Sequence, residues 1–184
     1  MKMRPDWARS FWSGKIGRDA SLVNGVPHEA MLQMMDRAGI ERAFLIATKT
    51  GRLGVPGSWH LPYEIVAKAV ERHPGRFYGL AGLDPTEGMA GVRALERAVC
   101  EYGFIGAHMY PHWFELAPDH ARWYPFYAKC CELDVPICIC VGVPGPRIPM
   151  PPLKRSRCAH IRVNLGSMYC NCASSTWSLA SFDR

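Results

Sequence analysis

Residues 77–110 have the sequence FYGLAGLDPTEGMAGVRALERAVCEYGFIGAHMY, and this stretch decides the fold. Residues 77–83 and 104–110 are short apolar runs of the kind that form buried strands. Between them, Thr86 stands where a helix N-cap is expected, and apolar side chains follow at helical spacing to Glu101, at Met89, Val92, Leu95 and Val99. The stretch therefore predicts a strand, a helix and a second strand, which is the repeating unit of a parallel β/α fold.

The same pattern recurs on both sides of this unit. Amphipathic helices are predicted over residues 28–37, over 64–72 and from Pro125 to Leu133, and apolar strands over 43–47 and 135–141. Strands that begin near residues 43, 77, 104 and 135 have roughly the spacing that a βαβ crossover requires. Such a series forms either an open doubly wound sheet or part of a (β/α)₈ barrel. The sequence has no G-x-G-x-x-G after a strand and no P-loop motif, so a nucleotide-binding sheet loses its usual support.

Composition and charge exclude several classes of protein. The chain has 184 residues, 48% of them hydrophobic and 21% charged, which suits one folded domain. Residues 144–184 hold six Lys or Arg and one acid, so most of the net charge of +6 lies there and the rest is close to neutral. We therefore expect no nucleic-acid partner. Without a secretory signal or a membrane-length apolar run, we expect a cytoplasmic protein with no membrane association and with reduced cysteines.

Four motifs carry a resemblance to a known family. They are MDRAGIERA at residues 35–43, GLAGLDP at 79–85, EYGFIGA at 101–107 and YPFYAKCCELDVP at 124–136. In this order and spacing they resemble the amidohydrolase-related family, in the branch that includes aminocarboxymuconate-semialdehyde decarboxylase, over about residues 27–143. The resemblance implies a (β/α)₈ TIM barrel, of which this chain would supply about four parallel strands, and a metal-dependent hydrolase or carboxy-lyase that acts on a small organic acid.

The resemblance also implies a divalent metal, usually zinc, at the C-terminal ends of the strands. The family takes its ligands from an H-x-H after the first strand, a His after the fifth, often one after the sixth, and an Asp after the eighth. This sequence has no H-x-H, and Val143 stands where the fifth-strand His would be. We therefore assign no metal ligand and expect this chain not to bind the metal. Two alternatives stay open: a catalytically incompetent truncated fragment, and a half-barrel binding module that forms a homo-oligomer.

Three polar residues near strand ends are the candidates for chemistry. His108 lies near the end of the predicted strand 104–110, and Asp84 follows the strand 77–83, so both are candidate catalytic residues. His112, in the next loop, is a candidate for substrate binding. The alternatives are a strand histidine bonded to a carbonyl for His108, a surface-loop histidine for His112, and, for Asp84, the favoured role of capping the turn before the next helix.

Aromatic side chains in two loops complete the candidate site. Trp59 and His60, in the loop predicted over residues 50–60, and Trp113 are candidates to line a substrate mouth, or else they cover the barrel rim.

The chain changes character after residue 143. We divide it into a partial barrel domain, 1–143, and a basic tail rich in Pro, Cys and Ser, 144–184, for which we expect no regular structure. The tail holds Cys158-x-His160 and Cys170-x-Cys172, but their spacing fits none of the common zinc templates. We therefore favour disorder over a metal site in this segment.

Overall fold

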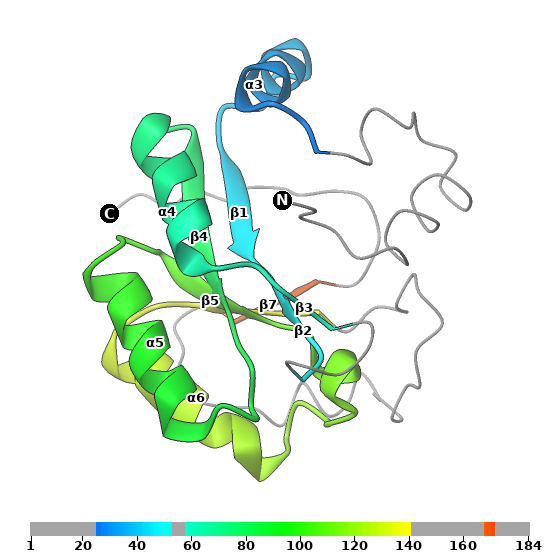
Figure 1. Ribbon diagram of the computed structural model, residues 1–184, viewed down its shortest axis with the longest axis vertical. Helices are drawn as coiled ribbons and strands as arrows, with labels where there is room; N and C mark the ends of the chain where they lie inside the picture. Colours follow the sequence, from blue (N-terminus) through cyan, green and yellow to red (C-terminus); the bar gives the residue numbers. More distant parts are fainter. Residues whose placement is uncertain (1–24, 53–57, 141–167, 172–184) are drawn as a thin grey trace.

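The computed structural model describes residues 25–52, 58–140 and 168–171, which form a parallel sheet with helices along one face (Figure 1). Five strands pair in parallel in the order β1-β4-β5-β6-β7. Their bounds are Ala43–Ala47 for β1, Phe77–Gly82 for β4, Gly106–Met109 for β5, Ile137–Cys140 for β6 and Met168–Asn171 for β7. The first four are the predicted strands.

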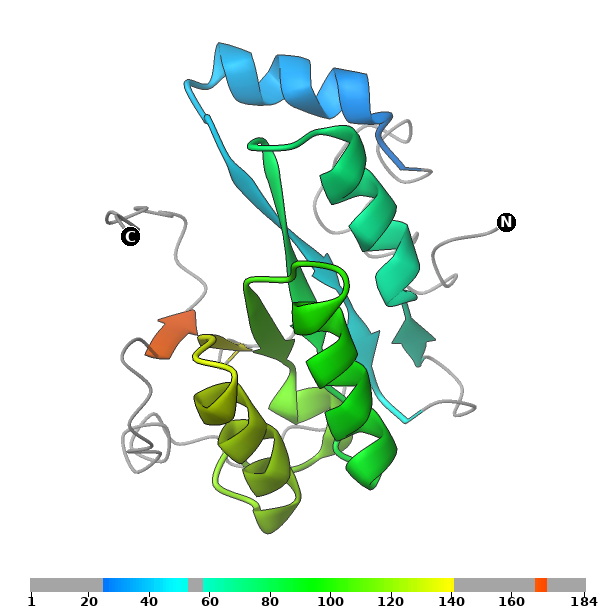
Figure 2. The same cartoon turned by 90° about the vertical axis from the view of Figure 1, so that its left-hand side faces the viewer.

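Four α-helices alternate with these strands as the sequence predicts. They are α3, His28–Arg37; α4, Tyr63–Arg72; α5, Gly88–Cys100; and α6, Tyr124–Glu132. Helices α4, α5 and α6 cover one face of the sheet, whereas α3 lies beyond the start of β1 (Figure 2). Gly39 ends α3 with a φ of 68°, a left-handed conformation that suits the predicted glycine cap. None of the helices in the described ranges combines the length and hydrophobicity needed to cross a bilayer.

The core lies between the sheet and the three helices that cover it. Leu95 of α5 and Phe126 of α6 are fully buried there, as predicted from their helical spacing. Burying a side chain of this size stabilises the fold by roughly 1.5–3 kcal/mol. The other large side chains with almost no exposed surface are Phe77, Leu83, Phe104, Met109, Trp123, Ile137 and Ile139. This core fixes the strands whose ends carry the polar site.

Cys100, Cys130 and Cys131 are free thiols. Cys130 on α6 is fully buried, and burial raises the pKa of its thiol to about 12. Cys131, Cys138 and Cys140 are half-buried, which is less than the core position predicted for them, and Cys100 is exposed.

The loop predicted over residues 50–60 contains a short antiparallel hairpin. Its strands are β2, Lys49–Thr50, and β3, Trp59–His60, and Lys49 pairs with His60. The prediction of a loop is therefore wrong at both ends of this segment. Strands of two residues are too short to show the alternation by which a strand is recognised. The hairpin matters because it places His60 beside the end of β4.

Two further predictions about these elements are wrong. Thr86 is not the N-cap of α5, which begins at Gly88 with Glu87 at the cap position and no side-chain capping bond. The strand 43–47 is predicted to be buried on both faces, but β1 is half-buried except at Ala47. β1 is the edge strand of the described sheet and pairs only with β4, so one side of it has no neighbouring strand to cover its side chains.

The segment after residue 143 provides a strand that the sequence analysis missed. Met168–Asn171 forms β7 and pairs in parallel with β6, with Met168 opposite Ile137. The prediction of no regular structure is therefore wrong for these four residues, which add one strand to the four that were predicted. Val143, the Cys158-x-His160 pair and Cys172 lie outside the described residues.

Candidate functional site at the C-terminal edge of the sheet

The polar groups of interest gather where the parallel strands end. Ala47 pairs with Ala81, and Gly82 pairs with His108, so the C-terminal ends of β1, β4 and β5 lie at one edge. Asp84 lies two residues after the end of β4, and the β2-β3 hairpin follows β1. In parallel β/α folds this edge carries the functional side chains. The location predicted for the candidate residues is thus the one they occupy.

Gly82 brings the backbones of β1 and β4 close together at this edge. A Cβ atom at this position would collide with the carbonyl oxygen of Ala47 and lie 2.7 Å from the amide nitrogen of Lys49. The buried hydroxyl of Tyr63, in the first turn of α4, donates a hydrogen bond of 2.6 Å to the Gly82 carbonyl. Burial, and next the Glu87 carboxylate, raise the pKa of Tyr63, so its hydroxyl stays a donor. Helix α4 is thereby tied to the strand end that precedes Asp84.

Asp84 is a buried carboxylate with only one of its two oxygens bonded. Its exposed fraction is 1%. Oδ1 accepts hydrogen bonds of 2.7 Å from both the backbone nitrogen and the hydroxyl of Thr86, so the favoured turn-capping role of Asp84 is confirmed. Oδ2 has no hydrogen-bond partner within the described chain. Leaving a charged oxygen buried and unpaired is costly, so this atom marks a position where a ligand would be stabilising.

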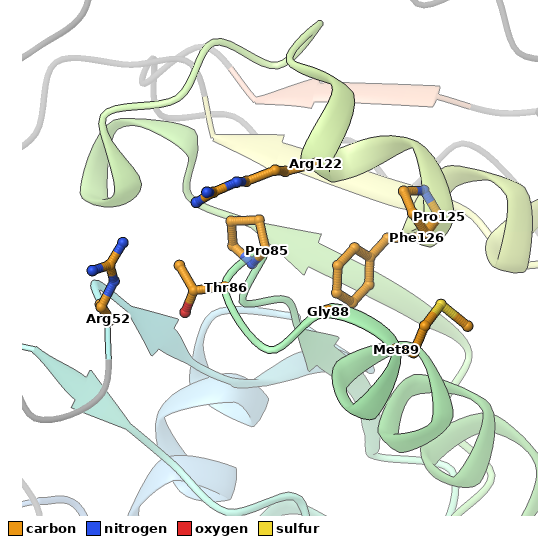
Figure 3. Close-up of a pocket in the computed structure, with 8 residues that line it drawn as sticks. All are labelled: Arg52, Pro85, Thr86, Gly88, Met89, Arg122, Pro125 and Phe126. Carbon is orange, nitrogen blue, oxygen red and sulfur yellow. The ribbon is translucent and has the colours of Figure 1, made fainter.

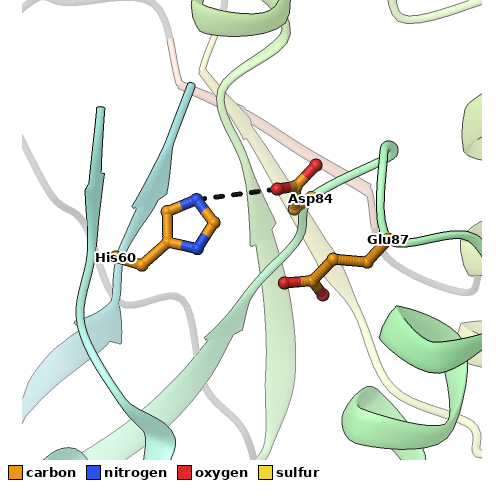
Figure 4. A group of neighbouring side chains, drawn as sticks. All are labelled: His60, Asp84 and Glu87. Atoms are coloured by element: carbon orange, nitrogen blue, oxygen red, sulfur yellow. Dashed lines mark ion pairs between the residues drawn. The ribbon is translucent and has the colours of Figure 1, made fainter. Parts of the chain in front are cut away.

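His60 stands across from this carboxylate on β3. Its Nε2 lies 2.8 Å from the carbonyl oxygen of Gly51 and 3.6 Å from Asp84 Oδ2, and the second distance is too long for a hydrogen bond. Figure 4 shows the imidazole ring facing both Asp84 and Glu87. Since the Gly51 carbonyl can only accept a hydrogen bond, Nε2 of His60 is the donor in this contact.

Glu87 and Lys49 complete the cluster. Lys49 Nζ lies 2.6 Å from Glu87 Oε2 and 5.0 Å from the centre of the Tyr63 ring. One ligand atom from each of His60, Asp84 and Glu87 lies within 4.8 Å of the others, so these three could hold a metal ion. Sequence reasoning missed Glu87 and Lys49. The Asp84-x-x-Glu87 spacing across the strand-to-helix turn was a usable signal, whereas Lys49 becomes recognisable only through the hairpin.

A second polar group lies on and after β5. His108 and His112 are 3% and 2% exposed, and neither Nδ1 has a hydrogen-bond partner in the described residues. Burial lowers the pKa of both to about 4, so both are neutral at pH 7. The His108 ring lies 4.2 Å from that of Tyr110. The alternative of a surface-loop histidine is wrong for His112, because the chain turns into a buried 3₁₀ helix, Pro111–Phe114, directly after β5.

The two tryptophans among the predicted residues lie in different elements. Trp59 is half-buried in β3, where its carbonyl accepts a hydrogen bond from the Thr50 hydroxyl. Trp113 is half-buried in the 3₁₀ helix, 6.5 Å from the ring of His112. The structure therefore brings His60 to Asp84 and His108 to His112. A substrate mouth shared by Trp59 and Trp113 stays a prediction.

A cavity of about 580 Å³ lies beside the turn that follows Asp84. The side chains of Arg52 and Arg122 line it from different parts of the chain (Figure 3). Its other walls come from Pro85, Gly88, Met89, Pro125 and Phe126. Guanidinium groups bind carboxylates through paired hydrogen bonds, so the cavity offers positive charge next to the acidic cluster.

A parallel β/α sheet with polar side chains gathered at its C-terminal edge is typical of part of a (β/α)₈ barrel. The profile of the amidohydrolase family matches residues 20–161, well over half of the chain. The chain therefore belongs to the amidohydrolase family. The matched range extends beyond the 27–143 over which the sequence motifs show the resemblance.

Two curated relatives fit this assignment. The chain is 37% identical over 110 residues to 2-keto-4-carboxy-3-hexenedioate hydratase of Sphingobium sp. strain NBRC 103272 / SYK-6, covering 55% of this chain and 32% of the relative. It is 29% identical over 132 residues to gamma-resorcylate decarboxylase of Polaromonas sp. strain JS666, covering 65% and 39%. The chain thus spans 32% and 39% of the length of these two relatives.

Solved structures with the same fold are TIM-barrel proteins. An uncharacterized TIM-barrel protein from Bordetella bronchiseptica has a TM-score of 0.59 at 20% identity, over 79% of this chain and 50% of its own. The 2,6-dihydroxybenzoate decarboxylase from Rhizobium has 0.55 at 21%, over 83% and 50%. A dihydroxybenzoic acid decarboxylase from Polaromonas sp. JS666, crystallised with manganese and 2-nitroresorcinol, has 0.51 at 24%, over 78% and 47%. These likenesses show that the fold is part of a (β/α)₈ barrel.

Proposed function

We propose that the protein is a metal-dependent hydrolase or carboxy-lyase that acts on a small organic acid. The observation that carries the proposal is the buried, half-bonded carboxylate of Asp84 at the C-terminal edge, with His60 and Glu87 beside it. A stable scaffold gains nothing from an unpaired buried oxygen, whereas a site for a ligand or an ion does. Membership of the amidohydrolase family, with relatives named as a decarboxylase and a hydratase, supports the reaction class.

The substrate class is supported by charge. Arg52 and Arg122 line the cavity next to the acidic cluster, and guanidinium groups favour a carboxylate-bearing ligand. The relatives are named for gamma-resorcylate and 2-keto-4-carboxy-3-hexenedioate, which are both carboxylic acids. We assign substrate contacts to His112, Trp59, His60 and Trp113.

The catalytic roles follow from the protonation states in the site. A divalent metal, zinc or manganese, supplies positive charge that polarises a carboxyl group and lowers the pKa of water. His108, neutral at pH 7 because burial lowers its pKa to about 4, acts as a proton acceptor. Asp84 holds the turn with one oxygen and presents the other to the site. Donors of the kind in His60, Asp84 and Glu87 suit such a metal, since imidazole and carboxylate both bind it.

A second candidate is a chain that binds its ligands without turnover. The observation in its favour comes from the sequence, which has no H-x-H motif. Val143 also stands where the family resemblance implies a histidine after the fifth barrel strand. For either candidate we propose a cytoplasmic location, a homo-oligomeric assembly and no nucleic-acid or membrane partner.

A decarboxylation and hydration assay tests the proposal. The purified chain, stripped of metal and then supplied with Mn²⁺ or Zn²⁺, is incubated with 2,6-dihydroxybenzoate, 5-carboxyvanillate and unsaturated dicarboxylic acids, and CO₂ release and ultraviolet absorbance are followed. We expect metal-dependent turnover of at least one acid, and its loss in His108→Gln. Saturable binding of an acid with no turnover under any metal would favour the second candidate.

A further inference from the structure

We propose a divalent-cation site formed by His60, Asp84 and Glu87. These positions differ from those at which the family resemblance places metal ligands. The prediction that this chain binds no metal rested only on the missing H-x-H motif and on Val143 in place of a histidine. The three residues proposed here come instead from the β2-β3 hairpin and from the turn between β4 and α5. The proposal rests on the metal dependence of the proposed function and names its ligands, and Mn²⁺ binding without turnover would contradict the proposed function while supporting the site.

Each of the three side chains has one polar atom held by the protein and one that is free to bind an ion. Gly51 holds His60 Nε2, Thr86 holds Asp84 Oδ1, and Lys49 holds Glu87 Oε2. This leaves His60 Nδ1, Asp84 Oδ2 and Glu87 Oε1. Ligands of bound metals are oriented by such second contacts, and a ligating histidine commonly donates its other N–H to a backbone carbonyl.

The three side chains converge, as Figure 4 shows, and His60 Nε2 lies 3.6 Å from Asp84 Oδ2. The ligand atoms offered by this group lie within 4.8 Å of one another. Nitrogen and oxygen ligands bind Zn²⁺ at about 2.0–2.2 Å in tetrahedral geometry, which places two ligands of one ion roughly 3.4 Å apart. The three side chains would therefore have to draw closer together to enclose an ion.

The burial of Asp84 separates this group from an ordinary cluster of acids. Its side chain is 1% exposed, and its Oδ2 lacks a hydrogen bond in the described residues. Lys49 forms an ion pair with Glu87, and no Lys or Arg in the described residues pairs with the negative charge of an Asp84 carboxylate. A divalent cation compensates this charge, and imidazole with carboxylates suits Mn²⁺ and Zn²⁺ better than a soft metal such as Cu(I).

The competing explanation is a proton in place of the metal. A protonated His60 would form an ion pair with Asp84 across the 3.6 Å that separates Nε2 from Oδ2. In that state the group needs no metal and should show no affinity for one. The two explanations therefore differ in a direct binding measurement.

Mn²⁺ binding to the full chain tests the site. Free Mn²⁺ is measured by electron paramagnetic resonance during titration of the wild type and of Asp84→Asn, Glu87→Gln and His60→Gln. Glu96→Gln is the matched control, because Glu96 lies on α5, the helix that Glu87 precedes, and also pairs with a lysine, Lys129, but away from the cluster. We expect one Mn²⁺ per chain, at least tenfold weaker binding in the three variants and unchanged binding in the control.

A spectroscopic readout keeps the test decisive if a variant folds poorly. The bound Mn²⁺ of the wild type should show nitrogen coupling from one imidazole, and His60→Gln should lose this coupling. Circular dichroism spectra check that each variant keeps its helices. Absence of Mn²⁺ binding in the wild type, or undiminished binding in folded Asp84→Asn and Glu87→Gln, would overturn the proposal.

Discussion

Replacing Tyr63 by phenylalanine tests how the site is anchored to the fold. The substitution removes a single buried oxygen, which donates a 2.6 Å hydrogen bond to the Gly82 carbonyl. The ring itself remains, with its centre 5.8 Å from that of Phe104 and 5.0 Å from Lys49 Nζ. The change therefore isolates one bond between α4 and the end of β4.

The expected cost is the loss of that bond, with the Gly82 carbonyl left buried. A buried polar group that loses its partner costs about 1–3 kcal/mol of unfolding free energy. In urea denaturation followed by circular dichroism, 1.5 kcal/mol at an m-value of roughly 1.5 kcal/mol/M lowers the midpoint by about 1 M.

Tyr124→Phe is the matched control, because the Tyr124 side chain is 54% exposed and its hydroxyl can bond to water. We expect the control to stay within about 0.5 kcal/mol of the wild type. A Tyr63→Phe variant as stable as the control would refute the reasoning that this hydroxyl anchors the strand end.

Three further predictions concern the same edge and core. Gly82→Ala should destabilise the chain by about 1–3 kcal/mol or more, because its Cβ has no room beside β1, and a denaturation midpoint equal to that of the wild type would contradict this. The pKa of His108 and His112 is lowered in the folded chain to about 4, so the unfolded chain binds more protons between pH 6.5 and 4. Stability should therefore fall as pH drops through that window, by at most about 3 kcal/mol from His108, and unfolding free energies that stay constant from pH 7 to 5 would argue against buried neutral rings. Under native conditions a thiol reagent should label the exposed Cys100 and spare the buried Cys130, as peptide mass spectrometry can establish, and equal labelling of the two would show that α6 does not protect its thiol.

Local patterns in the sequence were sufficient for most of the fold. The predicted helix 28–37 and strand 43–47 have the bounds that α3 and β1 show, because amphipathic spacing and short apolar runs are properties of the segment itself. The location of Asp84 at the edge of the sheet was predictable in the same way, because Asp84 follows an apolar run that was predicted to be a strand. Its turn-capping bond to Thr86 was also predictable, since aspartate commonly bonds the backbone two residues onward.

The features that the sequence did not reveal depend on contacts between distant segments. His60 was a candidate only for a substrate mouth, because its approach to Asp84 requires the hairpin to fold back along β4. The burial of His112 depends on the 3₁₀ helix that follows β5. β7 has only four residues, too few for a periodic signal, and its pairing with β6 comes from tertiary structure.

Anomalous X-ray diffraction from a crystal grown with Mn²⁺ would test the central claim most directly, namely that the C-terminal edge of this sheet is a metal-dependent site. We predict one anomalous peak between His60, Asp84 and Glu87, about 2.0–2.2 Å from Asp84 Oδ2. No peak between these side chains, with Mn²⁺ bound elsewhere on the chain or not at all, would contradict this account.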